Sequence, residues 1–206
     1  MYIIILYIQM KGKLRQLLVD ESTLRELKSA KQLLSLASGR RATSRDVIEE
    51  FVGRRLRFLL LKKELRDYIN GFVDKISRNE KILGVMLFGS VARGAYWKES
   101  DTDILIAVRG KAINIIEEVE EAIDEVEGLR IPLVQSEFFL RIRPLVLAED
   151  DLKLFRPIYL SIVEDGVILF ERRETLTNFT YDVRRNVEWR KEIVEGEVVL
   201  KWKIKA

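Results

Sequence analysis

The sequence predicts an α/β (α+β) fold, in which a mixed sheet is flanked by helices and preceded by a small, mainly helical N-terminal segment. Two short apolar runs, at residues 82–88 and 104–108, have the length of buried strands. Apolar residues three and four positions apart, the spacing of an amphipathic helix, lie before and after these runs. Alternating helices and strands are typical of layered folds that contain both.

The chain is long enough for one sizeable core or two small ones. It has 206 residues, of which 48% are hydrophobic and 33% are charged, as in folded proteins. We expect a strand-helix-helix segment at residues 1–56, a central domain of strands and helices at 57–175 and a basic extension at 176–206. The net charge of +3 is mild and does not by itself predict nucleic-acid binding.

The N-terminal segment opens with ten mostly apolar residues, which are too few to span a bilayer. They predict either an extra strand or a chain whose true start is Met10, and we slightly prefer the second interpretation. A short strand at 14–20 and two helical patterns follow, an order that resembles the ribbon-helix-helix fold of small DNA-binding antitoxins and repressors. The resemblance implies base contacts from Lys13, Arg15 and Gln16. The alternative is a helical hairpin that serves oligomerisation.

A helix whose apolar side chains fall on one face is predicted at residues 54–77, across the start of the central domain. A strand at 82–88 follows and leads to Gly89, which allows a tight turn, and to Ser90, which opens the next helix. The backbone N–H groups of such a turn and first helical residues can hold a phosphate. The second strand is expected to start at Asp103.

Ten residues separate the Gly89-Ser90 pair from Asp101, and a second acidic residue, Asp103, follows two positions later. Side chains two positions apart on a strand point to the same face, so the two carboxylates form a pair. Two carboxylates beside a phosphate-binding turn predict a site for a divalent cation that carries a triphosphate.

The pattern of Gly-Ser, ten residues and Asp-x-Asp, each end joined to an apolar run, resembles the nucleotidyltransferase superfamily that includes DNA polymerase beta. It is most similar to the minimal nucleotidyltransferases of prokaryotes. The resemblance implies transfer of a nucleoside monophosphate, in particular AMP, from a nucleoside triphosphate to a hydroxyl acceptor at a two-metal Mg²⁺ site. It makes Asp101 and Asp103 the catalytic metal ligands, and Gly89, Ser90 and Arg93 the nucleotide-binding residues.

A third carboxylate, usual in this family on the third strand, is not evident. An amphipathic helix at 112–127 is followed by Leu129–Val134, which we expect to be that strand. Pro132 stands where the family often has Asp, and the nearest acid is Glu137. Either Glu137 reaches the site or the third acid is missing, and the second case puts full catalytic competence in doubt. Weaker candidates for phosphate contact are Lys98 and Ser100.

The C-terminal part is expected to contain a short helix from Pro157, a strand at 167–170 and a hairpin at 192–204. Trp189 and Trp202 are interleaved with Arg and Lys residues in this tail. Such a surface suits contact with RNA or DNA by charge and stacking. The preferred interpretation is an arm whose tryptophans pack in a core.

The composition excludes several classes of chemistry. The chain has no Cys and no His, which rules out disulfides, thiolate and imidazole metal sites and a His general base. We expect a cytoplasmic protein. The abundance of Lys, Arg and Glu is typical of proteins from thermophiles. The resemblance implies a helical toxin-type protein as partner, and we expect a homo-oligomer without membrane contact. The alternatives are a DNA-binding regulator that uses the N-terminal segment, or a non-catalytic antitoxin that keeps the fold.

Overall fold

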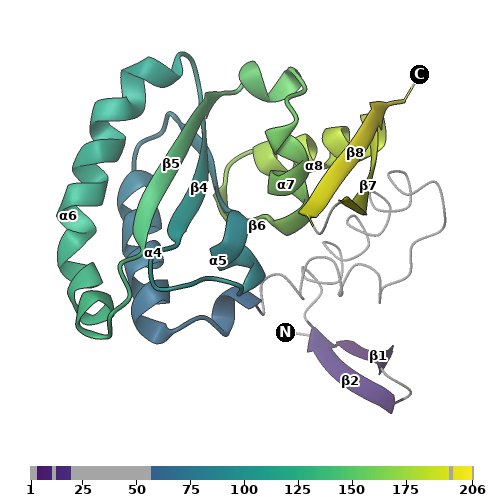
Figure 1. The fold of residues 1–206 in the computed structure, drawn as a ribbon, viewed down its shortest axis with the longest axis horizontal. Coiled ribbons are helices and arrows are strands. Elements are labelled where there is room, and N and C mark those ends of the chain that lie inside the picture. Colours follow the sequence, from purple (N-terminus) through teal and green to yellow (C-terminus); the bar gives the residue numbers. More distant parts are fainter. Residues whose placement is uncertain (1–3, 11–12, 20–56, 195–196, 206) are drawn as a thin grey trace. The chain divides into compact units, whose positions relative to one another are not determined.

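The computed structural model describes residues 4–10, 13–19, 57–194 and 197–205 (Figure 1). The chain forms two compact units, one of residues 54–183 and the other of residues 1–53 together with 184–206. Among the described helices, none is long and apolar enough to cross a membrane.

The larger unit is built on a four-stranded mixed sheet, which confirms the predicted fold class. The central strand β4 runs parallel to β5 on one side and antiparallel to β3 on the other, and β6 pairs antiparallel with the far edge of β3. In spatial order the strands are β5 (Arg141–Ala148), β4 (Asp101–Val108), β3 (Ile82–Leu87) and β6 (Val167–Glu171). The two apolar runs of the sequence are therefore the two central strands.

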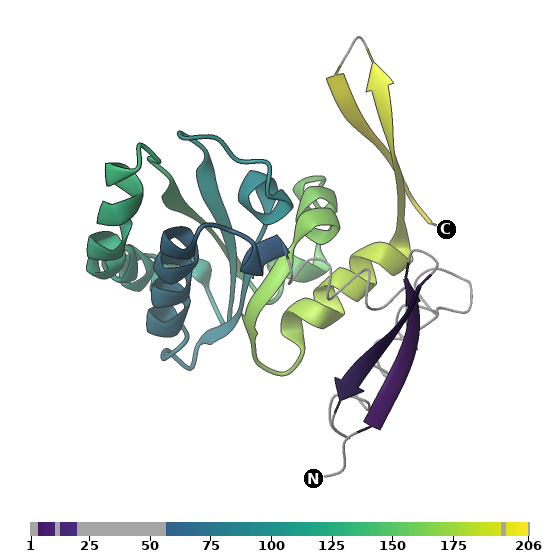
Figure 2. The same ribbon diagram turned by 90° about the horizontal axis from the view of Figure 1, so that it is seen from below.

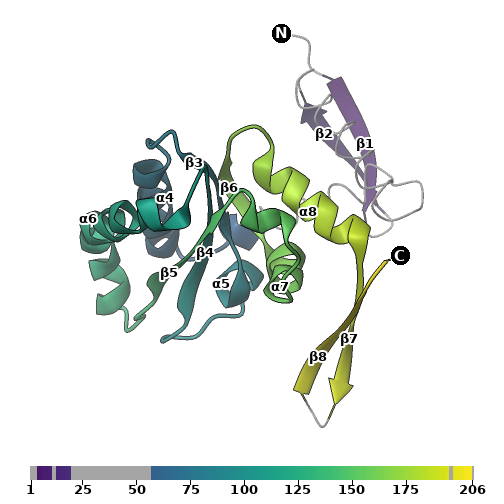
Figure 3. The ribbon, with the colours of Figure 1, turned by 90° about the horizontal axis from the view of Figure 1, so that it is seen from above.

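Helices cover both faces of this sheet. Figures 2 and 3 show α4 and α6 on one face and α7 and α8 on the other. The predicted apolar face of α4 is buried, from Leu65 to Ile76. From residue 63 to residue 186 the described helical segments are α4 (Lys63–Ile76), α5 (Gly89–Arg93), η2 (Ala112–Ile115), α6 (Ile116–Gln135), η3 (Asp151–Lys153), α7 (Ile158–Asp165) and α8 (Thr175–Asn186).

The third strand predicted at Leu129–Val134 is wrong, because α6 continues through these residues. Val119, Val126 and Leu133 are all buried, and their spacing of seven carries the apolar face of the helix to its last turn. Pro132 lies in that last turn. Its ring removes one backbone donor there without ending the helix early.

The end of α6 is a Schellman motif in which Glu137 holds the left-handed position that usually belongs to glycine. Glu137 has a φ of 62°, and its N–H donates to the carbonyl of Val134 at 2.9 Å. The N–H of Phe138 donates to the carbonyl of Leu133, also at 2.9 Å. The helix predicted to end at residue 127 therefore continues through Gly128 to Gln135.

The true third strand is β5, at the edge of the sheet, and sequence reasoning missed it. Pro144 interrupts its pattern, and an edge strand tolerates Pro because one of its sides has no hydrogen-bonded neighbour. The helix α6 forms the crossover that allows β5 to run parallel to β4. In this register Asp101 is the partner of Arg141, and Asp103 is the partner of Arg143.

The smaller unit contains two antiparallel hairpins. β1 (Ile4–Met10) pairs with β2 (Lys13–Val19), so the strand expected at 14–20 is present with a partner in the same chain. β7 (Val187–Val194) pairs with β8 (Glu197–Ile204). The two helices expected between residues 20 and 56 lie outside the described residues, so the ribbon-helix-helix interpretation stays a prediction.

Candidate functional site

The Gly-Ser turn and the acidic pair meet at one end of the central strands. β3 ends at Leu87 and α5 begins at Gly89, while β4 begins at Asp101. Because β3 and β4 are antiparallel neighbours, the end of the first strand lies beside the start of the second. The backbone N–H of Phe88 donates to the carbonyl of Asp103 at 3.0 Å, which joins the two segments directly.

Gly89 is required at this meeting point for two reasons. Its φ is 74°, in the left-handed region that glycine adopts without strain. A Cβ added to Gly89 would lie 2.3 Å from the carboxylate oxygen Oδ2 of Asp103, closer than any side chain can approach. The backbone of the turn therefore lies directly against one of the two acids, with Ser90 half-buried beside it.

The two carboxylates differ in their surroundings. Asp101 is exposed and Asp103 is half-buried. Burial raises the pKa of the Asp103 carboxyl above its usual value, and the negative charge of Asp101 raises it further. Arg143 and Arg93 lower that pKa in part. A cation bound between the two acids would relieve the repulsion that remains.

Arg93, at the end of α5, forms an ion pair with Asp165 at the end of α7. Its Nη1 donates to Oδ2 of Asp165 at 2.5 Å. Asp165 is almost buried, with 10% of its side chain exposed, whereas 43% of the Arg93 side chain is exposed. The buried carboxylate of Asp165 thus fixes the position of the Arg93 guanidinium, which remains accessible to solvent. Sequence reasoning selected Arg93 but missed Asp165, because the two lie 72 positions apart.

The loop between α5 and β4 is fastened to the residues that precede β5. The N–H of Phe139 donates to the carbonyl of Lys98 at 2.6 Å, and the Lys98 ammonium pairs with the Glu137 carboxylate. The hydrogen bond from the Lys98 ammonium lowers the pKa of the Glu137 carboxyl. Ser100 Oγ accepts the Trp97 N–H at 2.8 Å. Lys98, Ser100 and Glu137 thus all have partners within the loops.

Arg143 lies on the face of the sheet that carries the acidic pair, and sequence reasoning missed it. Its Nη1 donates to Oδ2 of Asp101 at 2.9 Å. Across residues 57–194 no group of three or more acidic side chains is placed to hold a metal ion. The residue paired with Asp103 on β5 is the positively charged Arg143. A third carboxylate, which is usual in the family on the third strand, would instead add a negative charge to the site.

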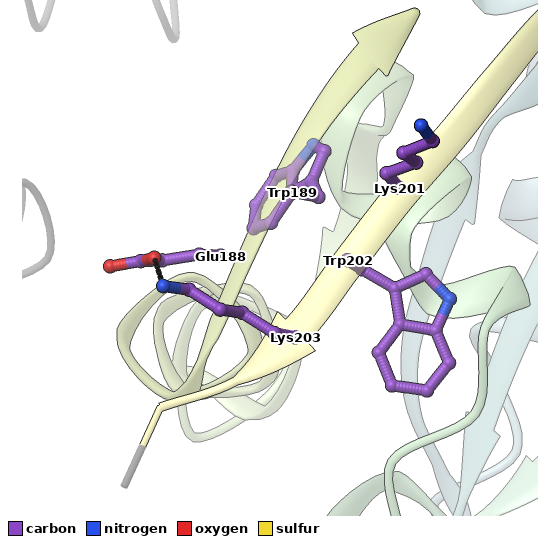
Figure 4. Close-up of a pocket in the computed structure, with 5 residues that line it drawn as sticks. All are labelled: Glu188, Trp189, Lys201, Trp202 and Lys203. Atoms are coloured by element: carbon purple, nitrogen blue, oxygen red, sulfur yellow. Dashed lines mark ion pairs between the residues drawn. The ribbon is translucent and has the colours of Figure 1, made fainter.

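A separate pocket of about 550 Å³ lies on the β7–β8 hairpin, in the smaller unit (Figure 4). Trp189 and Trp202 are direct partners across the two strands, and Glu188 pairs with Lys203 at 3.0 Å. Trp202 is 43% exposed, so it does not pack in a core as the preferred interpretation expected. The described lining also includes Lys201, and its one carboxylate is that of Glu188. Because the acidic pair is at Asp101 and Asp103, we place the candidate active site there and not in this pocket.

Comparison with known proteins gives one family. The family model described as Polymerase beta, Nucleotidyltransferase matches residues 71–175, which include both ends of the site. No curated protein sequence matches the chain.

Two solved structures are similar to the chain. A crystal structure of a toxin-antitoxin with AMP-PNP shares 19% identity over 59% of this chain and 83% of its own, with a TM-score of 0.37. A candidate nucleotidyltransferase from Sulfolobus solfataricus shares 21% identity over 59% of this chain and 89% of its own, with a TM-score of 0.30. At these values neither structure bears on what this chain binds.

Proposed function

Because the chain belongs to the polymerase beta nucleotidyltransferase family, we propose that it transfers a nucleoside monophosphate, in particular AMP, from a nucleoside triphosphate to a hydroxyl acceptor. The observation that carries the proposal is the contact between Gly89 and Asp103. A phosphate that rests on the backbone of the Gly89 turn lies next to the acidic pair. The triphosphate would then lie beside the two carboxylates that are proposed to bind the metal ion.

The donor set at Asp101 and Asp103 fits Mg²⁺. This ion takes oxygen ligands and is commonly bound by one or two carboxylates together with the phosphates of a substrate. The raised pKa of Asp103 reflects burial and repulsion from Asp101, and both effects favour a bound cation. When bound, Mg²⁺ would neutralise charge on the phosphates and so assist departure of the leaving group.

The residues of the chain would position the reactants. The backbone at Gly89 and Ser90 would hold the β- and γ-phosphates, and Arg93, fixed by Asp165, would add a charge-assisted contact. The acceptor hydroxyl would release its proton to solvent water as its oxygen forms a bond to the α-phosphorus. The bond from that phosphorus to the bridging oxygen breaks, and pyrophosphate leaves. Positioning and charge stabilisation supply most of the catalysis in such reactions.

We further propose that the acceptor hydroxyl belongs to a helical toxin-type partner protein. The support for this acceptor is the resemblance to those minimal nucleotidyltransferases of prokaryotes that are paired with a helical toxin and transfer AMP to it. DNA binding through Lys13, Arg15 and Gln16 is the second expectation, and its test is salt-dependent retardation of DNA that Arg15→Ala abolishes.

Transfer of label tests the proposal. The full chain is incubated with Mg²⁺, ATP labelled at the α-phosphate, and the protein encoded beside it as candidate acceptor. We expect label in the acceptor, its loss in Asp101→Asn and Asp103→Asn, and its retention in Asp124→Asn. Asp124 is an exposed acid on the outer face of α6 and serves as the matched control. Equal transfer by all three variants would contradict the assigned site.

A further inference from the structure

Arg143 is the charged residue nearest to the acidic pair on the neighbouring strand. β4 and β5 are parallel, and their register pairs Asp103 with Arg143. Partner residues in such a ladder place their side chains on the same face of the sheet, so Arg143 shares the face of both acids. Its guanidinium donates to one oxygen of Asp101 at 2.9 Å.

This ion pair adds little to the stability of the fold. The Arg143 side chain is 73% exposed and that of Asp101 is 49% exposed. Exposed pairs gain little because water and salt screen the attraction and because two long side chains lose freedom. The placement of a cation beside two carboxylates is therefore better explained by what the site binds.

The described acids are too few for two metal ions. Two-metal sites hold their ions about 4 Å apart and need carboxylates that each ion can share. Among the described residues no third acid joins Asp101 and Asp103 in a group that could hold a metal ion, because the Glu137 carboxylate is paired with Lys98 and the Asp165 carboxylate with Arg93. Two carboxylates with a triphosphate provide enough ligands for one Mg²⁺.

We propose that this site binds its nucleotide with one divalent ion and that Arg143 supplies the positive charge that a second ion would otherwise provide. The proposal rests on the proposed function and replaces the two-metal site expected from the sequence. Asp101 holds the Nη1 side of the guanidinium and keeps its second oxygen for the metal. The remaining donors of Arg143 bind phosphate oxygens in the fork geometry that arginine favours.

Counting Mn²⁺ ions tests the proposal without an activity measurement. Electron paramagnetic resonance of free Mn²⁺, with the full chain and an equimolar non-hydrolysable ATP analogue, gives the ratio of bound Mn²⁺ to bound nucleotide. We expect a ratio of about one for the natural chain and about two for Arg143→Asp, which adds a carboxylate to the site. Arg143→Leu keeps the ratio near one but weakens analogue binding about tenfold, because charge-assisted hydrogen bonds are lost.

The matched control is Arg109→Asp, which makes the same charge change at the opposite end of β4, where Arg109 is exposed. We expect it to change neither the ratio nor the affinity. A ratio of two in the natural chain, or unchanged affinity in Arg143→Leu, would overturn the role of Arg143 and leave nucleotide transfer standing. Absence of any analogue binding with Mn²⁺ would overturn both proposals.

Discussion

Gly89 and Asp103 are in direct contact, and each limits what the other position can hold. Gly89 has a φ of 74°, and a Cβ there would lie 2.3 Å from Oδ2 of Asp103. Gly94, at the end of α5, has nearly the same φ of 72°, but nothing lies within 4 Å of its Cβ position. Substitution of Gly94 therefore introduces backbone strain alone, whereas substitution of Gly89 introduces the same strain and also displaces the Asp103 carboxylate.

We predict that Gly89→Ala and Gly94→Ala each lose about 1–2 kcal/mol of stability, the cost of a left-handed conformation for a residue with a Cβ. Only Gly89→Ala should also weaken binding of a Mg²⁺-ATP analogue, by about tenfold or more, because the methyl group displaces Asp103. Thermal unfolding measures the first effect and fluorescence titration the second. Equal affinities in the two variants would show that the contact does not matter for binding.

The raised pKa of Asp103 predicts a pH dependence of stability. The folded chain holds this proton more tightly than the unfolded chain, so the stabilising contribution is complete below the unfolded pKa of about 3.9. It is lost as the pH rises through the folded pKa. Asp103→Asn cannot titrate, so without metal its Tm should improve relative to the natural chain between about pH 4 and pH 7. A flat or reversed difference in Tm between Asp103→Asn and the natural chain over this range would contradict the prediction.

At the scale of elements, the central strands were predicted from two continuous apolar runs, which are buried, and α4 was predicted from the helical spacing of its apolar residues. Prediction failed at the end of α6, since the residue in the left-handed position is Glu137, while Gly128 lies inside the helix. Because of that error the third strand was predicted at Leu129–Val134, whereas it lies at Arg141–Ala148. Arg143 was therefore not recognised as a residue of the site.

Substitution of Glu137 tests this description of the helix end. Glu137→Gly should raise the Tm, because glycine adopts a φ of 62° without the strain that a Cβ brings. Glu137→Ala keeps the strain and loses the pairing with Lys98, so it should not raise the Tm. Thermal unfolding of both variants decides the point, and a Tm of Glu137→Gly at or below that of Glu137→Ala would refute it.

At the scale of the whole molecule, every residue of the candidate site lies in the unit of residues 54–183. The spacing of Gly89, Ser90, Asp101 and Asp103 was enough to select them from the sequence. Arg143 and Asp165 were not predictable in this way, because each contributes through a partner 42 or 72 positions away. Such contacts depend on strand order and helix packing, which local patterns do not specify.

We propose that this unit folds and binds nucleotide by itself. A chain of residues 54–186, which keeps α8 whole, should unfold in one cooperative transition and bind a Mg²⁺-ATP analogue with an affinity within about threefold of the full chain. Calorimetry and titration measure the two properties. A fragment that folds cooperatively but fails to bind would mean that the smaller unit contributes to the site.

The central claim is that the acidic pair supports attack on the α-phosphate of a nucleoside triphosphate. It is tested most directly with two ATP samples, one labelled at the α-phosphate and one at the γ-phosphate, given with Mg²⁺ to the full chain and its acceptor. We predict that the α-label becomes covalently attached to the acceptor and that the γ-label is released in pyrophosphate. Attachment of the γ-label, or attachment of neither, would contradict nucleotidyl transfer at Asp101 and Asp103.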